Sequence, residues 1–321
     1  MLLIIIMSNF TMSDGFLLKV FSNKNSRLFE EAGNHVLKEF SGSKDQVGII
    51  YNDFNADPKM VDSWQKETKG MNVFHVAPRS KTLRMDAKVL FAKKTKDAVH
   101  VPKTYFSYDE IPADTPENTL FFVKKNGSTG SRGVDIHPYS AMKDLDYTER
   151  VVQQNMDTPD LYDDKRYKIR AYVVLHDKNV FLFNKSFATV ASEDHKEVVG
   201  DVDQEQLRKM HVIFQTSGTK FILSEELDKF EQVQQNMLVA CKEFKQVYRD
   251  EIKRIEANEF AILGFDFVVD SEGGVQVIEI NHRSNYAHPK LMENKVDVPL
   301  LKNLFKLLIQ GSSMDTDFRK V

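Results

Sequence analysis

The sequence has little cysteine and no strong excess of either charge, and each shortage excludes a class of protein. Cys241 is the only cysteine among 321 residues, so the chain cannot form an internal disulfide. A reducing, cytoplasmic setting is the simplest expectation. Lys and Arg number 44 against 47 Asp and Glu, which leaves a formal net charge of −3. That balance gives no global reason to expect nucleic acid or an anionic membrane as a partner.

Long hydrophobic runs, internal repeats and low-complexity tracts are also missing. The apolar opening, residues 1–7, lacks a basic leader and is shorter than the core of about 7–15 residues plus cleavage region of a signal peptide. It is far below the roughly 20 residues that a membrane span needs. We expect a disordered leader over residues 1–14, or a start at Met7 or Met12, rather than a membrane anchor.

What is present is an alternation of strand-like and helical segments, which predicts a mixed α/β and α+β fold. With 41% apolar residues, the chain can form a substantial core and two or three lobes. The predicted strands cover residues 16–20, 47–51, 71–76, 120–124, 134–137, 150–155, 167–175, 180–184, 260–270 and 275–281. We expect a small N-terminal α/β lobe, a central lobe with a glycine-rich loop, a C-terminal lobe and a flexible tail, over residues 15–80, 81–154, 155–310 and 311–321 respectively.

Three helices are predicted, over residues 26–40, 82–96 and 226–256. In the last and longest, apolar residues recur every three or four positions, and this stripe includes Cys241. Such a stripe is typical of a helix face that packs on a core. We therefore interpret Cys241 as a packing residue and not as a nucleophile.

Two apolar runs near the C-terminus contain the strongest chemical signal. Residues 260–270 and 275–281 are joined by Ser-Glu-Gly-Gly, a pattern typical of a β-hairpin. A four-residue loop makes Asp270 face Val275 and places Asp266 directly opposite Glu279. Asn281 shares that face because side chains alternate along a strand. A five-residue loop would put the two carboxylates on opposite faces, so the inference depends on this register.

Two opposed carboxylates in a pair of apolar strands repel each other and lose hydration, and a divalent cation would offset both effects. The side-chain oxygens of Asp266, Glu279 and Asn281 suit Mg²⁺ better than Zn²⁺. The plainer alternative is that these residues are polar groups at strand ends, facing solvent or arginine side chains.

Two further stretches could hold an anion. Residues 124–133 combine three glycines with hydroxyl side chains and an arginine, so their backbone N–H groups can wrap phosphate oxygens. An ordinary hairpin tip explains the same composition. Lys124 lies at the end of an apolar strand, where a charge needs a partner. Lys168 and Arg170 share one strand face and also need anions, unless they lie on a solvated edge strand.

In chain order, these stretches resemble the tubulin-tyrosine ligase-like branch of the ATP-grasp superfamily. FFVKKNGSTGSRGVDI resembles its segment of strand, lysine and flexible loop, VVQQNMDTP resembles its adenine-side linker, and RYKIRAYVVL resembles its KFDIR strand. LGFDFVVD and VIEIN resemble its paired metal-binding strands and are the most specific part. The likeness covers roughly residues 80–290. It implies an ATP-grasp architecture with ATP between the central and C-terminal lobes.

Carried over position by position, the resemblance implies a role for each residue. Lys124 would contact the ATP phosphates, Arg170 would steady the transferred phosphate or acyl-phosphate, and Lys185 is a further candidate cation. Mg²⁺ would be held by Asp266, Glu279 and Asn281. The other nucleotide-binding positions would be Gly127, Ser128, Thr129, Gly130, Ser131, Arg132, Gly133, Gln153, Gln154, Asn155, Met156, Arg166 and Lys168.

Four positions depart from the family pattern. Lys168 stands where the family has the aspartate associated with the nucleotide ribose, and Arg166 stands where it has a lysine. Met85 replaces the lysine of an Arg-Lys-Asp element that approaches the reacting end of ATP. Asn155 replaces a tyrosine in the linker. The metal end of the pattern is therefore intact, whereas the sugar and substrate ends differ.

The resemblance implies an ATP-dependent carboxylate–amine ligase that works through an acyl-phosphate and joins an amino acid to a peptide or protein. Tubulin is one acceptor to consider. A basic strip that could meet its acidic tail, unless it is a solvated helix face, comprises Lys81, Arg84, Lys88, Lys93 and Lys94. A small-molecule or generic peptide ligase of the same fold is one alternative. A nucleotide-binding protein without ligase activity is the other, and Lys168 and Met85 favour it.

Overall fold

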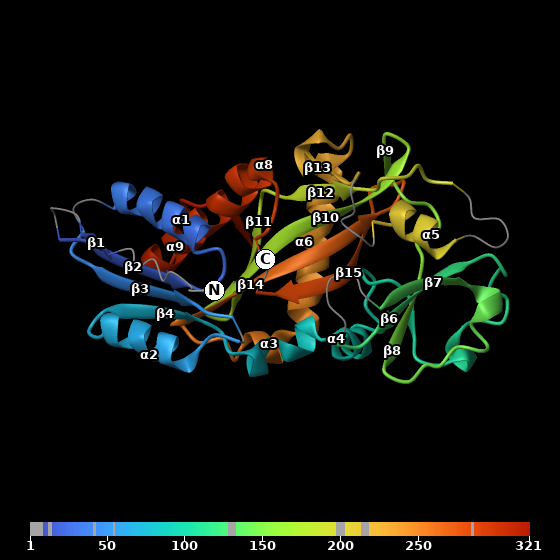
Figure 1. The fold of residues 1–321 in the computed structure, drawn as a ribbon, viewed down its shortest axis with the longest axis horizontal. Helices are drawn as coiled ribbons and strands as arrows, with labels where there is room; N and C mark the ends of the chain where they lie inside the picture. The colour runs from blue at the N-terminus through green and yellow to red at the C-terminus, as the bar shows by residue number, and fades with distance from the viewer. Residues whose placement is uncertain are drawn as a thin grey trace.

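Three groups of elements lie along the long axis of the molecule (Figure 1). An N-terminal group and a central group share one large mixed sheet, whereas a smaller group at the far end has a separate four-stranded sheet. The predicted mixed α/β and α+β fold is confirmed. The computed structural model describes residues 9–11, 15–40, 43–53, 55–127, 133–196, 203–212, 218–283 and 286–321. No helix in these residues combines the length and apolar character that crossing a membrane requires.

The N-terminal group consists of β1 (Asn9–Thr11), β2 (Leu17–Ser22), α1 (Ser26–Glu39), β3 (Gln46–Tyr51), α2 (Pro58–Glu67) and β4 (Asn72–Val76). β2, β3 and β4 pair in parallel, and β1 pairs antiparallel with β2. α1 packs on one face of this sheet and α2 on the other. Because both faces are covered, the sequence of β3 is almost continuously apolar.

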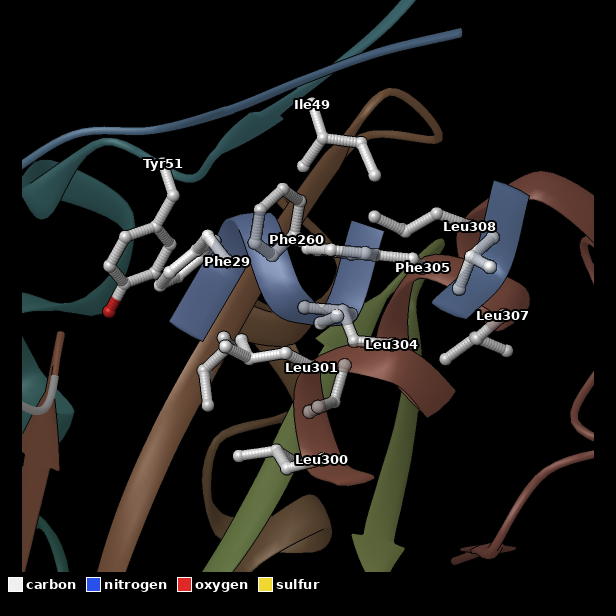
Figure 2. Close-up of a cluster of buried hydrophobic side chains, with 14 of the residues drawn as sticks. Phe29, Ile49, Tyr51, Phe260, Leu300, Leu301, Leu304, Phe305, Leu307 and Leu308 are labelled. Carbon is white, nitrogen blue, oxygen red and sulfur yellow. The ribbon is translucent and has the colours of Figure 1, made fainter. Parts of the chain in front are cut away.

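The C-terminal helix α9 (Val298–Gln310) completes the N-terminal group. Its apolar side chains pack against α1 and the sheet, as Figure 2 shows for Phe305 beside Phe29 and below Ile49. Phe260 comes from the central group but lies among the same side chains. The N-terminal and central groups therefore share one hydrophobic core.

The central group consists of β9 (Leu161–Tyr162), β10 (Lys165–His176), β11 (Asn179–Phe183), β12 (Phe187–Val190), β13 (Lys220–Leu223), α6 (Phe230–Val247), α7 (Arg249–Ile252), β14 (Glu259–Val269), β15 (Val275–His282), α8 (Lys290–Met292) and β16 (Phe318–Lys320). β14 pairs antiparallel with β10 and β15, and at its start it pairs in parallel with β4. α6 covers the face of β10 that carries Ile169 and Ala171. Lys168 and Arg170 alternate with these residues and so lie on the opposite face.

The smaller group is an antiparallel sheet with the order β5-β8-β6-β7. Its elements are β5 (Thr104–Tyr105), β6 (Leu120–Lys125), β7 (Val134–Pro138) and β8 (Arg150–Gln154). A helix from later in the chain, α5 (Gln204–Met210), packs beside β7 (Figure 1). The Gln204 amide bonds the backbone N and O of Ile136, and Arg208 pairs with Asp135. α5 is therefore anchored to the four-stranded sheet.

All ten predicted strands are present, but two predicted helices are interrupted. The helix predicted over residues 82–96 is divided into α3 (Arg79–Asp86) and α4 (Lys88–Lys94), because Ala87 is extended with ψ 117°. The helix predicted over residues 226–256 begins only at Phe230 and gives way to α7 at Tyr248, whose φ is −103°. Cys241 is buried in the core as predicted, and burial raises the pKa of its thiol to about 12.

Candidate functional site

The hairpin of β14 and β15 brings Asp266 and Glu279 opposite each other, as predicted. The predicted pairing of Asp270 is wrong. Asp270 lies in the loop, because its carboxylate accepts hydrogen bonds from two backbone N–H groups of the loop, and Val269 forms the last pair of the ladder. A five-residue loop alone would put the carboxylates on opposite faces, but a β-bulge at Ile278 restores their pairing.

The same bulge provides a partner for Lys124, near the end of β6. A bulged residue is left out of the regular ladder, and the Ile278 carbonyl accepts a hydrogen bond from Lys124 Nζ at 3.0 Å. Burial is the main reason that the pKa of Lys124 falls to about 8; Glu279 opposes this change, and Lys88 and Lys168 add to it. A phosphate group beside Lys124 would favour its protonated form.

Arg170 and Asp266 form an ion pair across the β10–β14 ladder. They are directly opposite in register, and Arg170 Nε and Nη2 donate to the two carboxylate oxygens at 2.5 and 3.1 Å. Lys168 Nζ lies 3.8 Å from the same carboxylate. Burial would raise the pKa of Asp266, but Arg170, Lys168 and Lys124 hold it below its ordinary value. Asp266, which was predicted to bind a metal ion, is therefore also the anion that pairs with Lys168 and Arg170.

Glu279 is the more accessible of the two carboxylates. Its side chain is 34% exposed and lies 3.1 Å from Lys88 Nζ. Asn281 follows two residues later on β15, where it pairs with Gly264. In the described part of the chain, no three His, Cys, Asp or Glu side chains come together as a metal cluster.

The donor set at this hairpin nevertheless fits magnesium. Asp266 and Glu279 offer carboxylate oxygens and Asn281 offers an amide oxygen. Mg²⁺ is usually bound by one or two carboxylates together with substrate phosphates, rather than by an all-protein cage. A metal that enters with a nucleotide therefore needs only these few donors. The assignment of the three residues to Mg²⁺ stays a prediction.

Lys88 is a residue whose place in the site the sequence did not reveal. It begins α4, directly after the break at Ala87, and from there its side chain reaches Glu279. Met85, where the family pattern has a lysine, is fully buried in the core of the central group. Lys88 therefore supplies a positive charge near the position where the family lysine was expected.

Three other cations of the basic strip also have acidic partners. Lys81 Nζ lies 2.6 Å from Glu259, and Lys94 Nζ lies 2.7 Å from Glu251. Arg84 lies 3.5 Å from the same Glu251 carboxylate. Because these carboxylates offset much of the positive charge, the contacts favour a solvated helix face over a groove for an acidic tail.

A cleft with an open volume of about 850 Å³ lies where the four-stranded sheet faces β10, β14 and β15. Eight predicted residues line it: Lys124, Gln153, Gln154, Asn155, Met156, Arg166, Lys168 and Glu279. Three of the eight are cations and one is an anion, so the lining suits a polyphosphate.

The other predicted site residues do not line this cleft. Gly127 and Gly133 are described but lie outside its lining, as do Arg170, Lys185, Asp266 and Asn281. Lys185 lies in the connection between β11 and β12. Five loop positions lie outside the described residues, namely Ser128, Thr129, Gly130, Ser131 and Arg132. The roles assigned to all of these residues remain predictions.

Arg166 organises the linker that follows β8. Its Nη1 donates to Asn155 Oδ1 at 2.9 Å, its Nη2 reaches Met156 O at 3.5 Å, and its Nε donates to His195 Nδ1 at 3.1 Å. Burial lowers the pKa of Arg166 to about 10, and Asp157 opposes the change. These bonds hold the linker beside the cleft.

The cleft also contains residues that the sequence analysis missed. Phe122 could have been predicted from the sequence, since it lies two positions before Lys124 and therefore on the same strand face. His211 and Val212 gave no such signal, because only the packing of α5 beside β7 brings them to the cleft. Ile278 is there because of a bulge that no hydrophobic pattern indicates.

A comparison with protein-family models gives a match. The model of the tubulin-tyrosine ligase family matches residues 50–213, just over half of the chain. This span includes the glycine-rich hairpin, the linker after β8 and the strand that carries Lys168 and Arg170. Asp266 and Glu279 lie beyond it. A search among curated proteins found no match.

Proposed function

The chain belongs to the tubulin-tyrosine ligase family, and from this membership we propose how it acts as an ATP-dependent ligase on proteins or peptides. We propose that ATP phosphorylates a carboxylate and that the amine of an amino acid then displaces the phosphate. The acceptor in this proposal is a peptide or protein, with tubulin one of the candidates. The single buried cysteine supports placing the reaction in the cytoplasm.

The observation that carries the proposal is the arrangement around Lys124. Its ammonium group is enclosed at the bulge of β15, with Lys168 on the neighbouring strand face and the opposed carboxylates Asp266 and Glu279 nearby. A cleft with an excess of cations opens beside it. Such a site favours a ligand that carries several negative charges together with a divalent cation.

The proposed reaction needs no protein nucleophile. A carboxylate oxygen attacks the γ-phosphorus of ATP, the bond to the β–γ bridging oxygen breaks, and ADP leaves. The amine nitrogen then attacks the acyl carbon, the bond from that carbon to the phosphate oxygen breaks, and the amine loses a proton. The products are an amide, ADP and phosphate, and catalysis rests on positioning and charge stabilisation.

Several candidate site residues have a proposed part in this scheme. Lys124 and Lys168 neutralise phosphate oxygens, and Arg170 steadies the group being transferred while it orients Asp266. Mg²⁺, held by the β14–β15 hairpin, would supply further neutralisation of the β- and γ-phosphate charge. The loop over residues 127–133 is proposed to exclude water from the acyl-phosphate. Lys185 is proposed as an additional cation.

A second candidate is a nucleotide-binding protein that does not ligate. The contact that favours it is between Lys168 and Asp266, because Lys168 lies 3.8 Å from a carboxylate that the ligase scheme assigns to Mg²⁺. A lysine at this distance competes electrostatically with a metal ion. A ligase that acts on a small molecule or a generic peptide is a variant of the first proposal.

Calorimetric titration with ATP, with and without Mg²⁺, tests the nucleotide site. We expect magnesium-dependent binding by the wild type and weaker binding by the double variant Asp266→Asn/Glu279→Gln. Glu272→Gln is the matched control, because Glu272 lies exposed in the loop of the same hairpin. A folded wild type that binds no ATP would overturn the proposal.

Release of ADP then separates the two candidates. The wild type is incubated with Mg²⁺, ATP, the twenty amino acids and a panel of peptides that includes acidic tubulin-tail sequences. ADP release that requires both an amino acid and a peptide supports the ligase. Tight ATP binding without ADP release in any mixture supports the nucleotide-binding protein.

A further inference from the structure

His211 lies in the cleft with one ring nitrogen committed to the protein. It follows the last residue of α5, and its ring meets Phe122 edge to face at a centroid distance of 5.4 Å. His211 Nδ1 lies 2.9 Å from the Leu207 carbonyl oxygen. A carbonyl oxygen can only accept a hydrogen bond, so Nδ1 carries the proton. Nε2 is then a hydrogen-bond acceptor.

This second nitrogen is buried and has no hydrogen-bond partner in the part of the chain that the structure describes. Burial lowers the pKa of His211 to about 3, and the charge of Arg166 acts in the same direction. The ring is therefore neutral at physiological pH, and its acceptor role is retained. A buried acceptor without a partner costs about 1–3 kcal/mol, which a ligand with a suitable donor would recover.

The backbone around His211 is held in an unusual conformation. The next residue, Val212, has φ 54°, a left-handed value that is uncommon for a β-branched residue and costs of order 1–3 kcal/mol. α5 itself is fixed to β7 through Gln204 and Arg208. The imidazole is thus presented by a firmly anchored element.

The position of His211 relative to Lys124 indicates which part of a nucleotide it meets. Phe122, the ring partner of His211, lies two residues before Lys124 on the same face of β6, a separation of about 7 Å along a strand. Arg166 and the linker residue Asn155 line the same cleft as His211. A nucleotide with its phosphates at Lys124 would therefore reach Phe122 and the linker with its base.

We propose that His211 Nε2 accepts a hydrogen bond from the amino group at purine C6 and so selects adenine over guanine. This inference rests on the proposed function. Guanine carries a carbonyl oxygen at C6, which would place two acceptors against each other. Gln153 Oε1 is a second buried acceptor without a partner among the described residues, but an amide can turn to present a donor. His211 Nε2 cannot become a donor in this way, because the Leu207 carbonyl holds the proton on Nδ1.

Calorimetric binding of three nucleotides by the intact protein tests the inference. They are ATP, purine riboside triphosphate, which lacks only the 6-amino group, and 2′-deoxy-ATP. We expect the wild type to bind ATP on the order of tenfold more tightly than purine riboside triphosphate, as one hydrogen bond predicts. We expect His211→Phe, which keeps the ring contact but has no acceptor, to bind the two nucleotides with nearly equal affinity. The control is His35→Phe, on the exposed face of α1.

Each outcome decides a separate point. Equal affinity of the wild type for ATP and purine riboside triphosphate overturns the role of His211 without any variant, so a folding defect in His211→Phe cannot hide the answer. A preference for ATP that persists in a folded His211→Phe also overturns it. If His211→Phe instead loses discrimination against 2′-deoxy-ATP, the acceptor faces the ribose and the assignment to the base is wrong. A wild type that binds none of the three overturns the proposed function itself.

Discussion

At the end of the cleft near Lys124, called the phosphate end, the charged groups have partners within the protein. At the end near His211, called the base end, two buried acceptors have no partner among the described residues. Lys124 bonds the Ile278 carbonyl and Glu279 pairs with Lys88. At the other end, His211 Nε2 and Gln153 Oε1 lack partners. A nucleotide must therefore compete with existing contacts at the phosphate end. At the base end it would supply the hydrogen-bond donor that the unpaired acceptors lack.

This difference divides the tasks of binding and chemistry. Groups that are already ion-paired are held in position, but a ligand gains little net energy by replacing one partner with another. An unpaired acceptor gains a full hydrogen bond when a donor arrives. We therefore expect the base end to decide which nucleotide binds, and the phosphate end to decide how fast it reacts.

The largest effect is expected from breaking the ion pair at the phosphate end. Asp266→Asn leaves Arg170, whose side chain is only 20% exposed, without its carboxylate, and we expect the free energy of unfolding to fall by about 3–5 kcal/mol. Urea denaturation measures it. The control is Glu205→Gln, which removes an exposed pair with Lys209 and should cost about 0–1 kcal/mol. Equal effects of the two variants would mean that the pair is not buried as described.

Glu279→Gln separates chemistry from folding at the same end. Glu279 is partly exposed, so its replacement by glutamine should leave the unfolding midpoint nearly unchanged. Loss of its charge should lower the rate of ADP release on the order of 10²- to 10³-fold, the effect of removing one group that stabilises charge in the transition state. Glu272→Gln should retain full activity. Normal turnover by Glu279→Gln would end the assignment of this residue to Mg²⁺.

Affinity for ATP should depend on pH through Lys124. Its pKa near 8 lies below the ordinary value, mainly because of burial, and bound phosphate favours the charged form. We expect constant affinity below pH 7 and a decline of up to about tenfold per pH unit above pH 8, with proton uptake on binding. Titration in buffers of different ionisation enthalpy measures both quantities. Lys124→Arg, which stays charged, should abolish the decline; a flat wild-type profile would contradict the prediction.

A smaller effect should come from the neighbouring lysine. Lys88 lowers the pKa of Lys124 by repulsion and also pairs with Glu279, which raises it. Lys88→Met removes the repulsion and releases Glu279, so the midpoint of the pH profile should move upward by less than about one unit. The same titrations measure this shift, and Lys93→Met, which removes a charge near Phe106, is the control. A downward shift would contradict the pairing.

The sequence predicted the strands and the strand-face residues well because both depend on local alternation. Lys168 and Arg170 share a face, and Asp266 faces Glu279, as the pattern indicates. The alternation pattern could not predict the bulge or the loop. Asp270 enters the loop because its carboxylate accepts hydrogen bonds there, and a hydrophobic pattern does not encode such bonds. Two deviations of one residue each then cancelled, so the predicted pair was right although its derivation was not.

Contacts that depend on packing between distant segments were not predicted. Lys88 reaches Glu279 only because the helix breaks at Ala87, and the apolar spacing there continues across the break. His211 reaches the cleft because α5 packs beside a strand about seventy positions earlier in the chain. A periodicity within one segment contains no information about either contact.

The parallel pairing of β4 with β14 has a consequence for motion. It makes the N-terminal and central groups one continuous sheet, and the core that contains Phe260 and α9 joins them further. These two groups should behave as a single rigid body. The four-stranded sheet is separate, so we expect any hinge-like opening of the cleft to move this sheet, together with α5 and His211. Entry of the nucleotide and recognition of its base would then be steps of the same movement.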